Sequence, residues 1–205
     1  MPPRYAESVF INCPFDTAYG ALLDAIVFAV HDCGFVARSA LEVRDTGEVR
    51  MNKILRLIRS SRFGIHDISR TELDPKFNLP RFNMPLELGL FLGAKAFGVG
   101  IHKRKVCLVL DSERFRYQIF CSDIAGQDPA SHSGDPAEAI VAVRDFLSPH
   151  TRSLLPGGRR IVERYAEFRK QLPDLRAAAG LTEDTLTFPD YSALVSVWLS
   201  AHNEI

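Results

Sequence analysis

The chain has 205 residues, of which 46% are hydrophobic and 24% charged, a composition typical of a globular protein. Lysine plus arginine equals aspartate plus glutamate at 25 each, so the formal net charge is zero. General nucleic-acid binders normally carry an excess of basic residues, so we do not expect nucleic acid as a partner.

The amino-terminal segment MPPRYAESVFINCPFD lacks the apolar core of a signal peptide, and no apolar run approaches the roughly 20 residues needed to cross a bilayer. The four cysteines (Cys13, Cys33, Cys107 and Cys121) show neither CxxC pairs nor zinc-like spacing. They are most simply buried thiols in a reducing compartment. We therefore expect a cytoplasmic protein that has no metal site and does not contact a membrane.

Short β-type runs alternate with longer helical patterns along most of the chain. The run SVFIN predicts a first strand at 8–12, and further strands are expected at 35–40, 62–68 and 105–111, with a short fifth strand somewhere within 118–132. Apolar residues at helical spacing predict intervening helices at 22–33, 49–60, 83–97 and 136–147.

This alternation predicts a parallel sheet covered on both faces, that is, a three-layer α/β domain over residues 1–148 with the flavodoxin-like strand order 2-1-3-4-5. A breaker-rich connection, SPHTRSLLPGG, then leads to a charged helix from RRIVERYAEFRKQL and a last helix from about Asp190. We expect residues 149–205 to form a helical extension, packed on the domain or at a dimer interface.

Ligands of open parallel sheets bind beyond the carboxyl ends of the strands, at the point where the strand order reverses. Polar or aromatic residues follow the expected strands at this edge, and two more lie where the next helix begins. The candidates are Asn12, Phe15 and Asp16 after the first strand, Arg38 at the second, Asp67, Ser69 and Arg70 after the third, Asp111 after the fourth, and Asn83 and Glu87 on the helix. Each also has a structural interpretation, such as capping a turn or opposing a helix dipole.

Glu87 is the most unusual candidate, because it is the only carboxylate in the apolar stretch FNMPLELGLFLGAKAFG. We place it in the first helical turn, where N–H dipoles favour the ionised form. Gly89 and Gly93 are expected to let this helix lie close to the sheet.

The sequence contains no GxGxxG, P-loop or GxSxG motif. A fixed carboxylate in a crevice instead suits chemistry in which positive charge develops on a sugar, as when an N-glycosidic bond breaks. If the leaving group is the nicotinamide of NAD, it is already cationic and needs no acid.

The segments SVFINCPFD, NKILRLIRSSRFGIHDIS and FNMPLELGLFLGAK resemble the first strand and loop, the helix and third strand, and the following helix of bacterial TIR-like domains. The same region resembles nucleoside 2-deoxyribosyltransferases and related N-glycosidases, in which an Asp follows the third strand and a Glu-x-Gly motif lies on the next helix. The residues Asn12-Cys13-Pro14 depart from the Ser-rich turn usual in TIR domains.

The resemblance implies that Glu87 is the catalytic carboxylate and that Asp67 contacts the sugar or base. It implies a hydrolase that cleaves NAD or a related nucleotide as its substrate, with no separate cofactor, in bacterial antiviral defence. Assembly as a homo-oligomer, with a partner protein from the defence system, is also implied. Two alternatives stay open: a non-catalytic nucleotide-sensing or assembly module, and a nucleoside (deoxy)ribosyltransferase.

Overall fold

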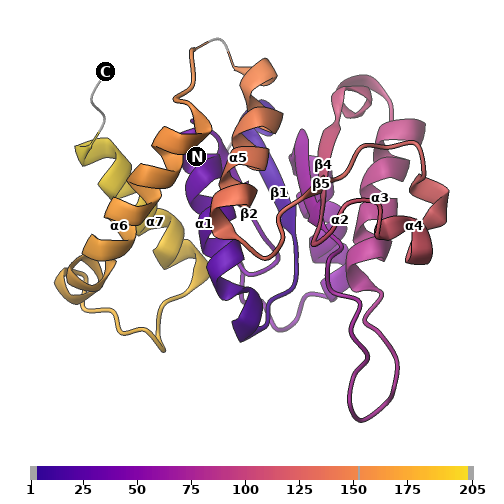
Figure 1. Ribbon diagram of the computed structural model, residues 1–205, viewed down its shortest axis with the longest axis horizontal. Helices are drawn as coiled ribbons and strands as arrows, with labels where there is room; N and C mark the ends of the chain where they lie inside the picture. The colour runs from indigo at the N-terminus through magenta and orange to yellow at the C-terminus, as the bar shows by residue number, and fades with distance from the viewer. Residues whose placement is uncertain (1–3, 152, 203–205) are drawn as a thin grey trace.

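The computed structural model describes residues 4–151 and 153–202. At its centre is a five-stranded, all-parallel sheet in the order β2-β1-β3-β4-β5 (Figure 1). The strands are β1 (Ser8–Asn12), β2 (Val36–Arg38), β3 (Phe63–Asp67), β4 (Val106–Asp111) and β5 (Ala130–Ser131). The expected strand order is confirmed, and the switch point lies between β1 and β3.

Helices cover both faces of this sheet. They are α1 (Gly20–Asp32), α2 (Arg50–Ser60), α3 (Asn83–Phe97), the short α4 (Tyr117–Phe120), α5 (Pro136–Leu147), α6 (Gly158–Ala178) and α7 (Phe188–Ala201). On one face, Phe10 of β1 packs with Ile54 of α2 and Phe91 of α3. On the other face, Val9 and Ile11 pack with α1 and α5, because successive strand residues point to opposite sides.

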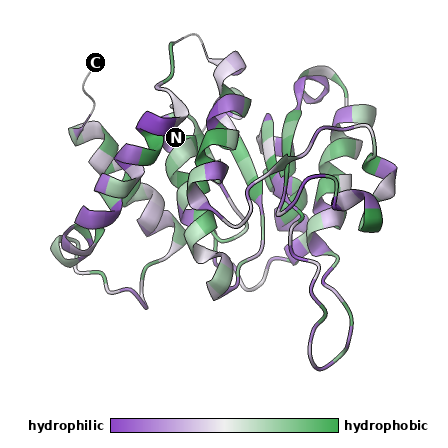
Figure 2. Cartoon of the chain, in the orientation of Figure 1, coloured by the Kyte–Doolittle hydropathy of each residue, from purple (hydrophilic) through white to green (hydrophobic). Residues whose placement is uncertain are grey.

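The middle of helix α1 is enclosed on all sides. Every residue from Ala25 to Val30 is completely inaccessible to solvent, as expected of a helix that is apolar all round. The sheet and α5 cover one side, and α6 and α7 cover the other, where Phe28 contacts the rings of Phe168 and Trp198. The carboxyl-terminal extension therefore forms a fourth layer on its own chain (Figures 1 and 2).

Strand β2 and helices α6 and α7 begin or end at other residues than the sequence predicts. Strand β2 has three residues rather than six, since it pairs only with β1 over the register Ser8↔Val36 to Phe10↔Arg38. Helix α6 continues past Pro173 to Ala178, and α7 begins at Phe188, where Thr187 and Asp190 form a capping box. None of the described helices combines the length and apolar content needed to span a bilayer.

The glycine that brings α3 close to the sheet is Gly64 of β3. A Cβ atom there would lie 2.9 Å from the ring of Phe91, so only glycine admits this ring without displacement. The expectation for Gly89 and Gly93 was wrong. A Cβ at Gly89 would meet nothing within 4 Å, and one at Gly93 would meet only the Phe97 ring of the same helix at 3.9 Å.

Candidate functional site

A cavity of about 410 Å³ opens at the carboxyl edge of the sheet. Its walls come from the segments that follow β1, β3, β4 and β5 and from the first turns of α1 and α5, as expected for a ligand site in this fold. The side chains that the site geometry depends on are Tyr19, Ser69, Arg70, Ser112, Arg116 and His132.

Asp67, the last residue of β3, lies beneath this cavity and is completely buried. Its Oδ2 atom accepts a hydrogen bond from the Tyr19 hydroxyl and lies 2.9 Å from His132 Nε2. Its Oδ1 atom accepts from the backbone N–H of Ser69 at 2.8 Å. The Gly134 N–H donates to His132 Nδ1 at 3.0 Å, while His132 Nε2, although close to Asp67 Oδ2, has no hydrogen-bond partner among the described residues. Asp67 therefore reaches the cavity through Tyr19 and His132.

Asp111, at the end of β4, holds Arg116 in place. Arg116 Nε donates to Asp111 Oδ1 at 2.9 Å, and its other nitrogens donate to Thr71 Oγ1 at 2.7 Å and to the Ser69 carbonyl at 2.5 Å. These bonds tie the loop after β4 to the loop after β3. Asp111 is 1% exposed, so its carboxylate supports the wall of the cavity and is not presented to a ligand inside it.

Asp16 makes the corresponding connection between the loops after β1 and β3. Its Oδ1 atom accepts from the Tyr19 N–H at 3.1 Å, which caps a short 3-10 turn (Thr17–Tyr19), and it pairs with Arg70 Nη2 at 2.6 Å. The turn formed by Asp16 agrees with one of the structural interpretations raised by the sequence. Arg70 keeps part of its side chain at the cavity surface.

Asn12 makes its side-chain contacts on the opposite face of the sheet, with α3 and β3. Its Nδ2 atom donates to the Met84 carbonyl in the first turn of α3 at 2.9 Å and lies 3.1 Å from His66 Nδ1. Burial, with a smaller contribution from Lys105, lowers the pKa of His66 to about 3, so the ring is neutral and accepts this bond. Asn12 thus fixes the start of the helix that carries Glu87.

Glu87 lies in the second turn of α3 rather than the first, and it is 6% exposed. Its carboxylate accepts no hydrogen bond from the described residues, and the Nη2 atom of Arg50 is 4.0 Å from Oε1. Burial raises the pKa of Glu87, while Arg50 opposes that rise. The expectation that Glu87 lies in the first turn was therefore wrong: the first-turn N–H groups lie one turn away, and burial is the larger influence on its pKa.

The charges of Glu87 and Asp67 both affect the pKa of one group at the end of β1, the Cys13 thiol. Burial raises the pKa of the Cys13 thiol, and the carboxylates of Asp67, Glu87 and Asp16 raise it further. The three acidic side chains that raise this pKa come from the loop after β1, from β3 and from α3. Cys13 itself is 1% exposed and is kept as a neutral thiol.

The remaining candidates are not brought into this group. Arg38 forms a two-bond ion pair with Glu42, at 2.6 and 2.7 Å, at the end of β2. Phe15 is 37% exposed on the first loop, and Asn83 is exposed at the start of α3. Glu87 is not among the residues that line the 410 Å³ cavity.

Sequence reasoning missed Tyr19, Arg116 and His132. Tyr19 lies three residues after Asp16, and that spacing is a signal for a capped turn whose last residue faces the sheet. His132 directly follows β5, a strand of two residues that no periodic pattern reveals. Arg116 lies in a loop with no pattern at all.

No protein-family model matches this chain, and no curated protein matches it. Within residues 4–151 and 153–202, no three histidine, cysteine or acidic side chains are placed together so as to hold a metal ion.

Proposed function

We propose that the protein is a hydrolase that cleaves the N-glycosidic bond of NAD or a related nucleotide, with Glu87 as its catalytic carboxylate. The observation that carries this proposal is the state of Glu87: a nearly buried carboxyl that accepts no hydrogen bond from the described residues. A desolvated carboxyl at the ligand edge of a sheet is a typical functional group.

Cleavage of the N-glycosidic bond requires this same desolvation of the Glu87 carboxyl. As the base departs, the sugar becomes oxocarbenium-like, and a carboxylate stabilises that cation far more strongly in a dry site than in water. Arg50 is 58% exposed and only 4.0 Å from the carboxylate. A substrate whose sugar approaches Glu87 displaces the guanidinium of Arg50. The positive charge that develops on the sugar then takes the place of the arginine charge beside the carboxylate.

Asp67 has a positioning role in this proposal. It is completely buried, but Tyr19, which donates to it, and His132, whose Nε2 atom lies 2.9 Å from it, both line the cavity. Arg70 and Arg116 at the same wall provide donors for the phosphate oxygens of a nucleotide. The parts of the proposal that concern antiviral defence, a homo-oligomer and a partner protein depend on the family resemblance alone.

The test is release of nicotinamide or another base from NAD, ATP and nucleosides, followed by chromatography. Glu87→Gln keeps the volume and removes the charge, and we expect it to lower the rate by about 10²–10³-fold. Glu167→Gln, at an exposed acidic residue of α6 outside the cavity lining, is the matched control and should act like wild type. Equal release by wild type and Glu87→Gln would refute the proposal, as would no release from any substrate.

A second candidate is a module that binds a nucleotide without turnover. It is favoured by one observation, namely that Glu87 lies outside the lining of the 410 Å³ cavity. In that case mass spectrometry of the bound ligand recovers the nucleotide intact, and Arg116→Gln weakens binding whereas Glu87→Gln does not. Transfer of the sugar to another base, the third candidate, requires an added acceptor base for appreciable product.

A further inference from the structure

An apolar groove lies between α2 and α3 and shares no lining residue with the 410 Å³ cavity. The two helices run side by side in the same direction, because Arg50 at the start of α2 lies 4.0 Å from Glu87 and the last turns of both helices line the groove. Its volume is about 220 Å³, below the roughly 300–1,000 Å³ of small-molecule sites, so it fits one or two side chains of a larger partner. Its apolar lining includes Leu55, Ile58, Leu90, Ala94 and Gly98.

Exposed apolar side chains extend this groove along both helices. On α3, Leu86, Leu90 and Phe97 recur at helical spacing, and Leu86 is 51% and Phe97 89% exposed. On α2, Met51 and Leu55 are four residues apart and each 39% exposed. Residues at such spacings share one face of a helix. An apolar strip therefore follows α3 from residue 86 to 97, a length of roughly 16 Å.

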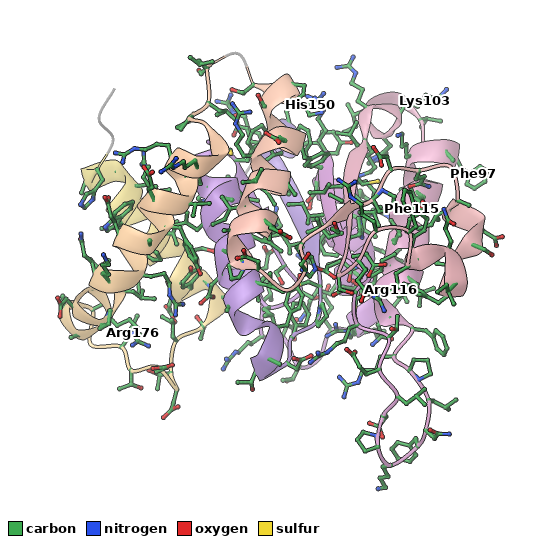
Figure 3. All side chains as sticks on the ribbon, in the orientation of Figure 1. Phe97, Lys103, Phe115, Arg116, His150 and Arg176 are labelled. Carbon is green, nitrogen blue, oxygen red and sulfur yellow. The ribbon has the colours of Figure 1, made fainter. Side chains whose placement is uncertain are left out.

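The charged residues around this strip are almost all basic. Neither residues 49–62 nor residues 88–110 include an aspartate or a glutamate, although the whole chain has equal numbers of acids and bases. Glu48, just before α2, is already paired with Arg56 at 2.9 Å. Figure 3 labels Phe97 and Lys103 at the periphery of the molecule. Four exposed cations of these two segments form no ion pair with another described residue: Arg59, Lys95, Lys103 and Arg104.

We infer that the groove between α2 and α3 binds an acidic amphipathic helix of a partner protein. A third helix can lie along two parallel helices at an interaxial distance of about 8–10 Å. Its apolar residues at i, i+3, i+4 and i+7 then enter the groove between Leu55 and Leu90. Its acidic residues on either side of that face meet Arg59 and the basic residues after α3. The length of the strip matches about three turns of such a helix.

Shape and charge disfavour the other occupants. A flat anionic surface, such as a bilayer or a nucleic acid, contacts the basic rim but leaves the concave apolar floor at Ile58 and Leu90 unfilled. A second copy of this chain is disfavoured because α6, its longest described helix, has more basic than acidic residues. An acidic amphipathic helix complements both the apolar floor and the basic rim.

The experiment is fluorescence anisotropy with the full chain and a labelled synthetic peptide as the probe. The peptide has about four helical turns, with leucines at i, i+3, i+4 and i+7 and glutamate at most other positions. We expect a Kd of about 1–100 µM at low salt that weakens as the salt concentration rises. Two matched peptides, one with lysine for glutamate and one with serine for leucine, should each bind at least about tenfold more weakly.

Two variants at exposed positions test the location of binding. Leu55→Glu places an acid in the groove, and Arg59→Glu reverses a charge of its lining. Each should weaken binding of the acidic peptide at least about tenfold, and Arg59→Glu should strengthen binding of the lysine peptide. The controls carry the same changes elsewhere: Val197→Glu at a 61% exposed position of α7 and Arg159→Glu at a 95% exposed side chain of α6. Both controls should bind as wild type does.

Three results would overturn the inference. The first is no binding of the acidic peptide, or binding that Leu55→Glu leaves unchanged. The second is tighter binding, at the same salt concentration, to phosphatidylserine vesicles or to a single-stranded oligonucleotide, which would assign the basic rim to another class of partner. The third is a dimer in sedimentation that Leu55→Glu abolishes, which would assign the groove to a second copy of this chain.

Discussion

Arg50, the first residue of α2, holds its Nη2 atom 4.0 Å from Oε1 of Glu87 on α3. This pair joins an exposed cation to a nearly buried carboxylate across two helices on one face of the sheet. Burial raises the pKa of Glu87, and Arg50 offsets part of that rise.

Replacement of Arg50 by alanine should therefore raise the pKa of Glu87 further. If the proposed hydrolysis depends on ionised Glu87, the acidic limb of the pH–rate profile moves to higher pH in this variant. A ¹³C NMR titration of the Glu87 side-chain carboxyl measures the same shift without requiring turnover. Arg59→Ala, on the same helix and outside this pair, is the control. An unchanged titration in Arg50→Ala would show that the pair has no electrostatic effect.

Substitution of Tyr19 by phenylalanine should destabilise the fold. The Tyr19 hydroxyl donates to Asp67, and its removal leaves a completely buried carboxylate with one donor fewer. We expect a loss of about 1–3 kcal/mol in the free energy of unfolding, measured by urea denaturation at neutral pH. Tyr5→Phe removes an exposed hydroxyl bond to the Ile101 carbonyl and should cost less. Equal losses in the two variants would contradict the role given to Asp67.

Acidification should destabilise the protein through its buried histidines. Burial lowers the pKa of His66 to about 3 and that of His31 to about 4, well below the unfolded value of about 6.5. Between pH 6.5 and those values the unfolded chain binds more protons than the folded one. This contribution to stability is complete above pH 6.5 and falls as the pH falls.

The measurement is urea denaturation at several pH values from 7 to 4. His66→Gln should give a smaller decrease with falling pH than wild type, because its side chain takes up no proton. His202→Gln, near the end of α7, is the control for replacing a histidine elsewhere. If the slopes of wild type and His66→Gln coincide, the ring does not titrate as the structure requires.

Truncation of Trp198 to alanine tests whether the extension belongs to the same core. Trp198 is 2% exposed, contacts Phe28 and Phe168, and donates from Nε1 to Gln171 at 3.1 Å. We expect a loss of about 3–5 kcal/mol in the free energy of unfolding in a single transition. Val197→Ala, at a 61% exposed position of the same helix, should have little effect. Two separate unfolding transitions in wild type would contradict a shared core.

The fold could be predicted from the sequence wherever apolar residues repeat at helical or strand spacing over enough residues to identify the element. The helix at Asn83–Phe97 follows from such a pattern, and the strand order follows from the usual order of flavodoxin-like folds; both are confirmed. Element ends were less predictable, because β2 and β5 depend on pairing with one neighbour rather than on their own residues.

The site was predictable only in part, for a related reason. A strand places its carboxyl-end residues at a known edge, and Asp67 and Asp111 are found there. Which partner each side chain chooses is a tertiary property. Arg38 pairs with a neighbour in sequence, whereas Arg116 reaches across to another loop, and no local pattern distinguishes the two.

The enclosure of α1 also affects how the protein is made. This helix is translated before its outer cover, α6 and α7, with strands β2 to β5 and helices α2 to α5 of the fold in between. Until those helices leave the ribosome, the apolar outer side of α1 lacks its native partners and is open to aggregation or chaperone binding. The hydrophobic interior of this molecule is therefore completed only when the carboxyl-terminal helices arrive.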